Sequence, residues 1–128
     1  YKFTKAILDK KPIDVYNNGQ MERDFTYVSD IARGFSSALT TPLDYEIINL
    51  GSDNPIKLLE FINVIEEIIG WETEKIFLPL QAGDVISTWA DISKAKTLLN
   101  YKPQVDIRKG LGDFVKWYKS YTKYNLIK

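Results

Sequence analysis

Three short segments of the chain hold the side chains best suited to chemistry. The first starts at Arg23 and continues Asp-Phe-Thr-Tyr-Val, directly after a turn. A guanidinium is a rigid fork of donors that matches phosphate oxygens and stays charged at any working pH, so Arg23 suits an anion at the edge of a cleft. The alternative is a structural arginine paired with Asp24 or Asp30, because surface ion pairs are common.

The second segment is Gln-Ala-Gly-Asp, residues 81–84. Gly83 would let the backbone approach a ligand closely, and the carboxylate of Asp84 could accept hydrogen bonds from two adjacent ribose hydroxyls. The same residues are also typical of an ordinary turn. The third segment, Asn-Leu-Gly-Ser at 49–52, lacks the glycine pattern of phosphate and dinucleotide loops, which favours a simple turn.

Aromatic side chains are a further set of candidates. Tyr16 and Tyr27 could stack on a base or a sugar ring, although strand aromatics more often belong to the core. Near the end of the chain Trp117, Tyr118, Tyr121 and Tyr124 interleave with lysines, a mixture that could bind single-stranded nucleic acid. Helical spacing favours the other interpretation, in which these aromatics face inward and the lysines face water.

Composition excludes several other kinds of chemistry. The chain has 128 residues and contains no histidine and no cysteine, so Ser-His hydrolysis, thiolate nucleophiles, disulfides and most transition-metal sites are excluded. Seventeen basic side chains balance 17 acidic ones, which leaves no overall field to attract nucleic acid or an anionic membrane. No apolar run approaches the roughly 20 residues of a membrane span, so we expect a cytoplasmic protein.

Hydrophobic periodicity predicts a single α+β unit in which helices and strands alternate. The first part should contain a helix within residues 1–11 and two strands, 13–16 and 23–28, paired as a hairpin. The expected elements that follow are a helix capped by Ser29 or Asp30, a strand at 45–50, a helix at 58–69 closed by Gly70, a strand at 75–78, a helix capped by Ser93 and closed by Asn100, and a helix capped by Asp106.

Together these segments resemble the C-terminal part of the extended short-chain dehydrogenase/reductases that modify nucleotide-sugars. The resemblance covers nearly the whole chain. It rests on a strand at 12–16, an Arg-Asp-Phe-x-Tyr-Val-x-Asp motif at 23–30, an Asn-x-Gly-x-x-x-Pro segment within 48–62, a Gly-Asp-Val, Thr, Ala-Asp series within 79–91, and a closing Ser-Lys-Ala, Tyr-x-Pro, Gly-Leu and Phe-Val-x-Trp-Tyr pattern within 93–118. The forms of the second and fourth motifs are most similar to those of UDP-glucuronate 4-epimerases.

The resemblance implies an NAD-dependent epimerase that inverts C4 of UDP-glucuronate by transient oxidation. It implies that residues 1–128 form the substrate-binding lobe and that NAD is held by a preceding Rossmann domain, which this chain does not contain. In that picture Arg23 contacts the diphosphate, Asp84 the ribose hydroxyls, Tyr16 and its strand the uracil, and Gln81 a position near the phosphates. UDP-galactose 4-epimerases typically have arginine at the position of Gln81. The parent enzyme would be a homodimer.

Two rival hypotheses remain open at this stage. One keeps the fold and changes the reaction to that of another nucleotide-sugar epimerase or a 4,6-dehydratase. The other is a non-enzymatic module whose basic, aromatic tail helix binds nucleic acid or a partner protein. Tyr124 and Lys128 have the spacing of the family's catalytic Tyr-x-x-x-Lys pair, but they follow the helix that ends the family's chain, so we interpret this spacing as coincidence.

The 128 residues alone are expected to show no 4-epimerase turnover and no binding of NAD. The reason is that the family's glycine-rich loop and catalytic Tyr-Lys pair have no counterpart here. Calorimetric titration with NAD and a turnover assay on the purified chain check this expectation, and either activity would contradict it.

Overall fold

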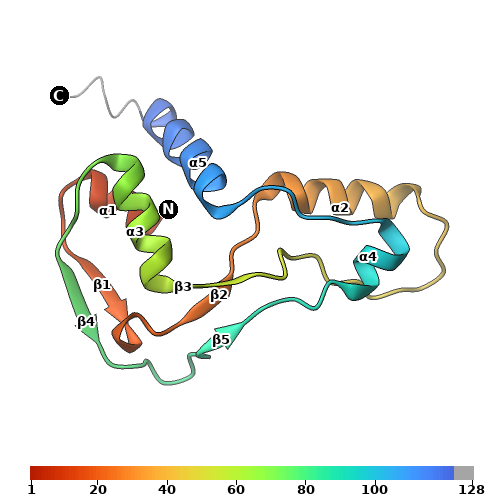
Figure 1. Cartoon of the computed structure of the whole chain (residues 1–128), viewed down its shortest axis with the longest axis horizontal. Helices are drawn as coiled ribbons and strands as arrows, with labels where there is room; N and C mark the ends of the chain where they lie inside the picture. Colours follow the sequence, from red (N-terminus) through yellow and green to blue (C-terminus); the bar gives the residue numbers. More distant parts are fainter. Residues whose placement is uncertain (123–128) are drawn as a thin grey trace.

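The computed structural model describes residues 1–122 and shows helices gathered at two ends of an elongated molecule (Figure 1). Helices α1, α3 and α5 lie at one end, α2 and α4 lie at the other, and short strands connect them. The elements are α1 (Lys2–Leu8), β1 (Ile13–Tyr16), the short 3-10 helix η1 (Asn17–Gly19), β2 (Glu22–Asp24), α2 (Val28–Thr40), β3 (Pro55–Lys57), α3 (Leu58–Ile69), β4 (Lys75–Leu78), β5 (Ser87–Thr88), α4 (Ser93–Leu99) and α5 (Ile107–Tyr121).

The larger core lies between α1, α3, α5 and strand β1. Each element contributes its apolar face: Ile7 from α1, Val15 from β1, Ile62 and Ile65 from α3, and Val115 from α5 are all buried. A smaller cluster around α4, formed by Ile92, Ala95, Leu99 and Tyr101, packs against Ala38 of α2 and against side chains of the 43–50 segment. The helices predicted within 1–11, at 58–69, at 93–99 and from Asp106 onward are confirmed. For α3 and α5 the signal was a long amphipathic pattern, which is the strongest one that a sequence offers.

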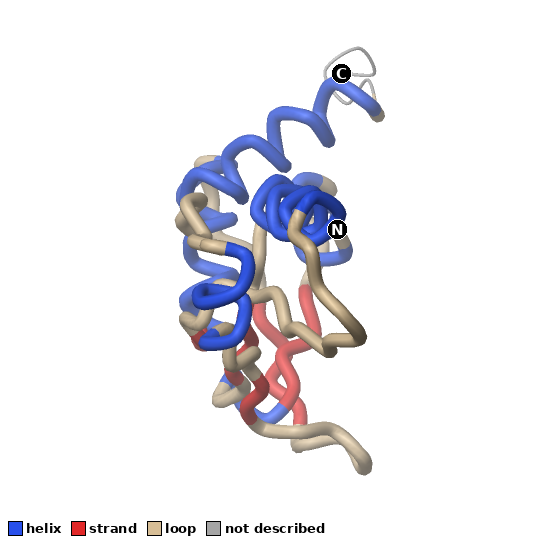
Figure 2. The backbone as a smooth tube through the Cα atoms, turned by 90° about the vertical axis from the view of Figure 1, so that its right-hand side faces the viewer, coloured by secondary structure: helices blue, strands red, loops and turns tan. Residues whose placement is uncertain are grey.

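The predicted hairpin between 13–16 and 23–28 is wrong. Strand β1 instead pairs in parallel with β4, with Ile13 opposite Lys75 and Tyr16 opposite Leu78. A parallel pair needs a long crossover connection, and helix α3 is part of the segment that joins these two strands. In Figure 2 the strands lie in the lower half of the view, with helices above them and at their left.

Strand β2 is the centre of a second sheet, in the order β3-β2-β5. It pairs antiparallel with β3 and parallel with β5, so that Arg23 lies opposite Ile56 on one side and Thr88 on the other. The predicted strand at 23–28 is thus shorter than expected, and the strands β3 and β5 were not predicted. Runs of two or three residues are too short to show a period of two in the sequence.

Helix α2 begins one residue before the predicted caps. Its N-cap is Tyr27, and Asp30 lies inside the first turn, fully buried. The carboxylate of Asp30 accepts hydrogen bonds from the backbone N–H groups of Gln104 and Val105, each at 3.1 Å, and also pairs with Arg33. Asp30 therefore fastens the segment before α5 to helix α2 instead of capping that helix.

The predicted strand at 45–50 forms no ladder within the described part of the chain. Tyr45 and Ile47 are 89% and 71% exposed, and no described strand lies beside the segment to pair with it. An apolar, β-prone sequence becomes a strand only when its N–H and C=O groups find a partner, because isolated extended backbone gains no ladder hydrogen bonds. The sequence pattern therefore indicated a β propensity at 45–50, but it could not show whether another strand lies beside this segment.

Helix α5 departs from the expectation that its aromatics face inward. Tyr118 is buried, but Trp117 and Tyr121 are 52% and 73% exposed and stack on each other with ring centroids 5.1 Å apart. Tyr124 lies outside the described residues. None of the described helices combines the length and apolar character needed to cross a lipid bilayer.

Two glycines allow a matched test of the helix ends. Gly70 closes α3 with a φ of +99°, whereas Gly112 lies within α5, and an added Cβ at either position would meet nothing within 4 Å. Gly70→Ala should lower the free energy of unfolding by about 1 kcal/mol, because only glycine adopts a left-handed backbone without steric cost. Gly112→Ala should instead raise it by roughly 0.5–1 kcal/mol. Urea unfolding followed by circular dichroism measures both, and equal changes of the same sign would contradict this account.

Candidate functional site

Arg23 lies in the middle of β2 and makes no ion pair with any described carboxylate. Its Nη1 donates to the backbone carbonyl oxygens of Glu22 at 2.7 Å and Ile86 at 3.2 Å. The two acids proposed as structural partners are engaged elsewhere, Asp24 with backbone amides and Asp30 with Arg33. Two carbonyls orient the guanidinium without neutralising it, so its charge stays available to a ligand. Within the described residues, the structural-pair alternative is therefore wrong.

Arg23 lines an open hollow of about 390 Å³, here called the Arg23 pocket. Among its lining residues Arg23 is the single cation, and the hydroxyls of Thr26 and Thr88 and the amide of Asn49 supply further polar groups. Trp89, which is 59% exposed, adds an aromatic face at the same place. The full lining consists of Arg23, Asp24, Thr26, Asn49, Leu50, Gly51, Thr88, Trp89 and Ala90. Such a hollow suits an anion that also carries hydroxyl groups.

Asp24 joins the three segments that form the wall of the Arg23 pocket. Its carboxylate accepts hydrogen bonds from the backbone N–H groups of Ser52 at 2.9 and 3.0 Å, Asp53 at 3.1 Å and Ala90 at 3.4 Å. Burial acts to raise the pKa of Asp24, but the hydrogen bonds from Ser52, Asp53 and Ala90 outweigh burial and hold that pKa below its ordinary value. The side chain is thus a charged acceptor for three amides at neutral pH.

Gly51 is needed where the loop after residue 50 approaches Asp24. A Cβ at Gly51 would lie 2.6 Å from the Cβ of Ala90 and 2.6 Å from Oδ2 of Asp24, closer than real atoms approach. The carbonyl oxygen of Gly51 accepts a hydrogen bond of 2.9 Å from the hydroxyl of Tyr101. The turn predicted at 49–52 is therefore packed tightly from both sides.

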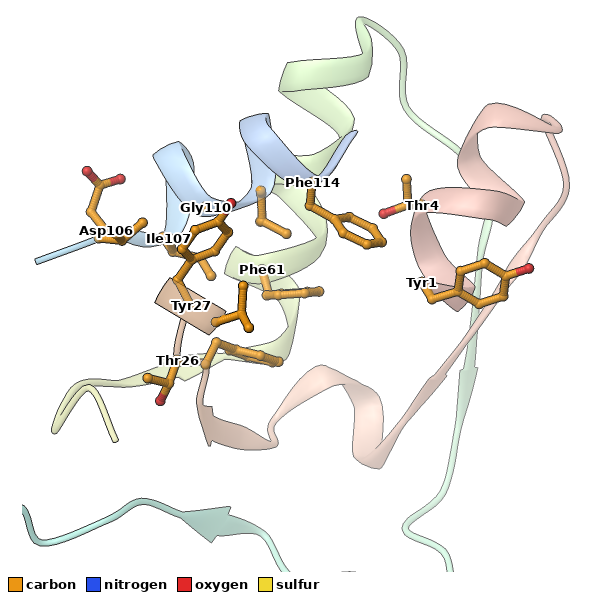
Figure 3. Close-up of a pocket in the computed structure, with 13 residues that line it drawn as sticks. Tyr1, Thr4, Thr26, Tyr27, Phe61, Asp106, Ile107, Gly110 and Phe114 are labelled. Carbon is orange, nitrogen blue, oxygen red and sulfur yellow. The ribbon is translucent and has the colours of Figure 1, made fainter. Parts of the chain in front are cut away.

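A second hollow, of about 300 Å³, is lined mostly by apolar side chains and is shown in Figure 3. Phe25 and Phe61 stack in it with ring centroids 4.0 Å apart. Figure 3 shows Tyr1, the N-cap of α1, and Thr4 of α1 across from Phe61 and Phe114. Its lining residues are Tyr1, Thr4, Phe25, Thr26, Tyr27, Val28, Phe61, Val105, Asp106, Ile107, Gly110, Leu111 and Phe114. The one carboxylate there, Asp106, already caps α5 by accepting from the N–H of Lys109.

Thr26 lines both hollows, so one short stretch after β2 borders a charged space and an apolar space. The hydroxyl of Thr4 in the apolar hollow has no hydrogen-bond partner, although the residue is buried. The apolar hollow lacks the convergent polar groups that orient a ligand, whereas the Arg23 pocket has them. We therefore regard the Arg23 pocket as the candidate site.

The structure does not bring the other predicted site residues into the Arg23 pocket. Gln81 and Asp84 lie in an exposed turn in which the N–H of Asp84 donates to the carbonyl of Gln81 at 3.1 Å. The stretch that follows this turn does reach the site, because Arg23 donates to the carbonyl of Ile86. Tyr16 is half-buried at the end of β1, which pairs with β4 and not with the sheet of Arg23.

Sequence reasoning missed the role of Asp24 and the contribution of residues 88–90. The sequence suggested Asp24 as an ion-pair partner for Arg23, whereas its carboxylate binds amides of two other segments. One signal could have revealed it: aspartate is disfavoured in strands, so an Asp inside a strand motif indicates a specific partner. Nothing local in the sequence indicates that residues 49–53 and 88–90 meet at that carboxylate.

The described residues offer no metal site and do not fit a dinucleotide. No group of three or more described His, Cys, Asp or Glu side chains is arranged to hold a metal ion. A dinucleotide site needs a glycine-rich turn that leads from a strand into the start of a helix. Strand β1 leads instead into the 3-10 helix η1, and β4 leads into the irregular stretch around Gln81.

Comparisons with known proteins show similarity to nucleotide-sugar epimerases. Residues 1–51 match the NAD dependent epimerase/dehydratase family. The chain is 47% identical over 120 residues to a UDP-glucuronate 4-epimerase of Thermodesulfobacterium geofontis, an alignment that covers 93% of this chain and 37% of the relative.

The chain is also similar to solved structures of nucleotide-sugar epimerases. The UDP-glucuronic acid 4-epimerase of Bacillus cereus, in complex with UDP-glucuronic acid and NAD, superposes with a TM-score of 0.83 and 39% identity over 91% of this chain and 38% of its own. A UDP-glucose 4-epimerase of Thermotoga maritima, solved with UDP-glucose, superposes with a TM-score of 0.88 and 27% identity over 94% of this chain and 39% of its own. The chain thus spans less than half the length of these relatives.

Stability should depend on pH through Asp24. Because its pKa is lowered in the folded state, its contribution to stability is complete above the unfolded pKa of about 3.9 and is lost as pH falls through the folded value. Asp24→Asn should therefore lower the free energy of unfolding by about 1–3 kcal/mol near neutral pH. The difference from the unchanged chain should shrink as pH falls below about 4. Urea unfolding across pH measures this, and a difference that is independent of pH would contradict it.

Proposed function

We propose that this chain is part of a member of the NAD dependent epimerase/dehydratase family and that it supplies the nucleotide-binding side of a UDP-sugar epimerase. The family match over residues 1–51 and the similarity to UDP-glucuronate 4-epimerases support this proposal. The longer protein would act on UDP-glucuronate and invert C4 by transient oxidation. The relative from Thermodesulfobacterium geofontis and the structure from Bacillus cereus, both named for UDP-glucuronate, support this choice of substrate.

The observation that carries the proposal is the free charge of Arg23 in an open polar pocket. Its Nη1 is held by two backbone carbonyls, and no described carboxylate neutralises the guanidinium. Buried or half-buried arginines are normally paired, because an isolated charge loses hydration. A half-buried guanidinium that is oriented and left unpaired is suited to the oxygens of a diphosphate.

The residues around Arg23 would hold the nucleotide end of the substrate. Arg23 would donate to the diphosphate, and the hydroxyl of Thr88 would bind a neighbouring oxygen. The Thr26 hydroxyl and the Asn49 amide now make long hydrogen bonds, of 3.4 Å to Asp24 and 3.5 Å to the carbonyl of Asp91, and would exchange them for oxygens of the ligand. An epimerase must keep its substrate while the sugar turns over, so affinity is best placed on the diphosphate and base, away from the reacting carbon. These residues satisfy that requirement without taking part in the redox step.

We further propose that the loop after β4 and the end of β1, which lie outside the Arg23 pocket, contact other parts of the nucleotide. Asp84 would bind the ribose hydroxyls, Gln81 would lie near the phosphates, and Tyr16 and its strand would contact the uracil. The contact between Arg23 and the carbonyl of Ile86 supports the first two roles, because it ties this loop to the Arg23 pocket. Gln81 carries no charge, so we expect it to contribute less to phosphate binding than Arg23 does.

NAD would bind to another part of the longer protein. The Bacillus cereus structure contains NAD, but the described residues of this chain do not provide a dinucleotide site. We therefore assign no oxidation or reduction step to any residue described here. The proposed function of this chain is confined to gripping and orienting the substrate.

Substitution of Arg23 should separate this proposal from a structural role. We expect Arg23→Gln to weaken binding of UDP by roughly 10- to 100-fold, because one set of charge-assisted hydrogen bonds is lost. Arg108→Gln is the matched control, since Arg108 is an exposed arginine that pairs with Glu67 on α3 and lies outside the Arg23 pocket. It should leave the dissociation constant for UDP nearly unchanged, as measured by isothermal titration calorimetry.

Titration of the longer protein with different UDP-sugars tests which sugar it prefers. UDP-glucuronate should bind more tightly than UDP-glucose or UDP-galactose. Preference for UDP-glucose would favour the reaction named for the Thermotoga maritima relative. Equal weakening of UDP binding by both arginine substitutions would reject the Arg23 pocket as the nucleotide site.

A further inference from the structure

We propose that Asp24 is a positioning residue: its carboxylate holds residues 49–53 and 88–90 in the geometry that makes the Arg23 pocket a ligand site. This inference rests on the proposed function. It assigns Asp24 no contact with substrate. Asp24 acts through the backbone of its neighbours, and it is adjacent in sequence to the arginine whose pocket it shapes.

The first step is the shortness of the sheet around β2. Strand β5 has two residues, Ser87 and Thr88, and β3 begins at Pro55, which has no N–H to donate. The ladder on both sides of β2 therefore ends close to Arg23. Beyond it, the Asp24 carboxylate binds Ala90 past the end of β5 and Ser52 and Asp53 before the start of β3. The Asp24 carboxylate thus holds both neighbouring segments to β2 at the point where the backbone hydrogen bonds of the sheet end.

The second step is that these two clamped segments form most of the pocket wall. Asn49, Leu50 and Gly51 come from one segment, and Thr88, Trp89 and Ala90 from the other. The hydroxyl of Tyr101 binds the carbonyl of Gly51 from the far side, so this loop is held at both its N–H and C=O groups. Apart from Asp24, the one direct hydrogen bond between residues 49–53 and 88–91 that is described is a long one, 3.5 Å, from the side-chain amide of Asn49 to the carbonyl oxygen of Asp91.

The third step concerns charge. A carboxylate beside a guanidinium would normally pair with it and cancel its field. The amides of Ser52, Asp53 and Ala90 use the acceptor capacity of Asp24, which leaves Arg23 without a carboxylate partner among the described residues. The same three hydrogen bonds therefore shape the pocket and keep the guanidinium available.

The test compares two isosteric substitutions of half-buried or buried acids. Asp24→Asn removes the charge that three amides share, and Asp30→Asn removes the charge shared by the amides of Gln104 and Val105, outside the Arg23 pocket. Both variants should lose stability. Only Asp24→Asn should raise the dissociation constant for UDP, at least tenfold, whereas Asp30→Asn should change it less than twofold at a temperature where both variants are folded.

A second measurement does not depend on any ligand. In ¹⁵N-resolved NMR spectra of the chain, Asp24→Asn should shift the signals of the Arg23 Nε–H group and of the Thr88 and Trp89 amides, and Asp30→Asn should leave them in place. If the unchanged chain binds no UDP, the proposed function fails, and these spectra alone decide the role of Asp24. Loss of UDP affinity in both variants alike, or unmoved Arg23 signals in Asp24→Asn, would overturn the inference.

Discussion

Three backbone N–H groups converge on the carboxylate of Asp24, and the candidate site depends on this interaction. An ionised carboxylate is a strong acceptor, and its hydrogen bonds to amides compensate for the hydration that it loses in a half-buried place. The lowered pKa of Asp24 is the electrostatic result of that arrangement. Because Ala90 is 38 residues from Ser52 and 37 from Asp53, one side chain organises contacts between two loops that are far apart in sequence.

The separation of roles between adjacent residues follows from this interaction. The carboxylate of Asp24 binds backbone amides. The guanidinium of Arg23 donates to two carbonyl oxygens, which orient it and leave its positive charge uncompensated. A binding group for a diphosphate needs both properties, a fixed direction and an available charge. The apolar hollow bordered by Thr26 lies next to this charged space, so a ligand held at Arg23 would meet aromatic side chains on one flank.

Much of the fold and part of the site could be predicted from the sequence. Helix α3 was readable because five apolar side chains recur on one face and Gly70 ends the run. The cap of α5 at Asp106 was readable for a similar local reason, since an N-cap aspartate binds an amide three residues ahead. Arg23 was a candidate anion ligand from its residue type and its motif, and the structure places its side chain in a polar pocket.

What the sequence by itself determined is the set of local elements and the identity of the charged group. Only the tertiary structure decided the partners: that β1 pairs with β4, that Asp30 binds Gln104 and Val105, and that Arg23 has no ion pair among the described residues. Periodicity and capping involve residues within four positions of each other, so they can be recognised in a short stretch of sequence. Strand pairing and amide–carboxylate contacts join distant residues, and their choice depends on which backbone groups packing brings together.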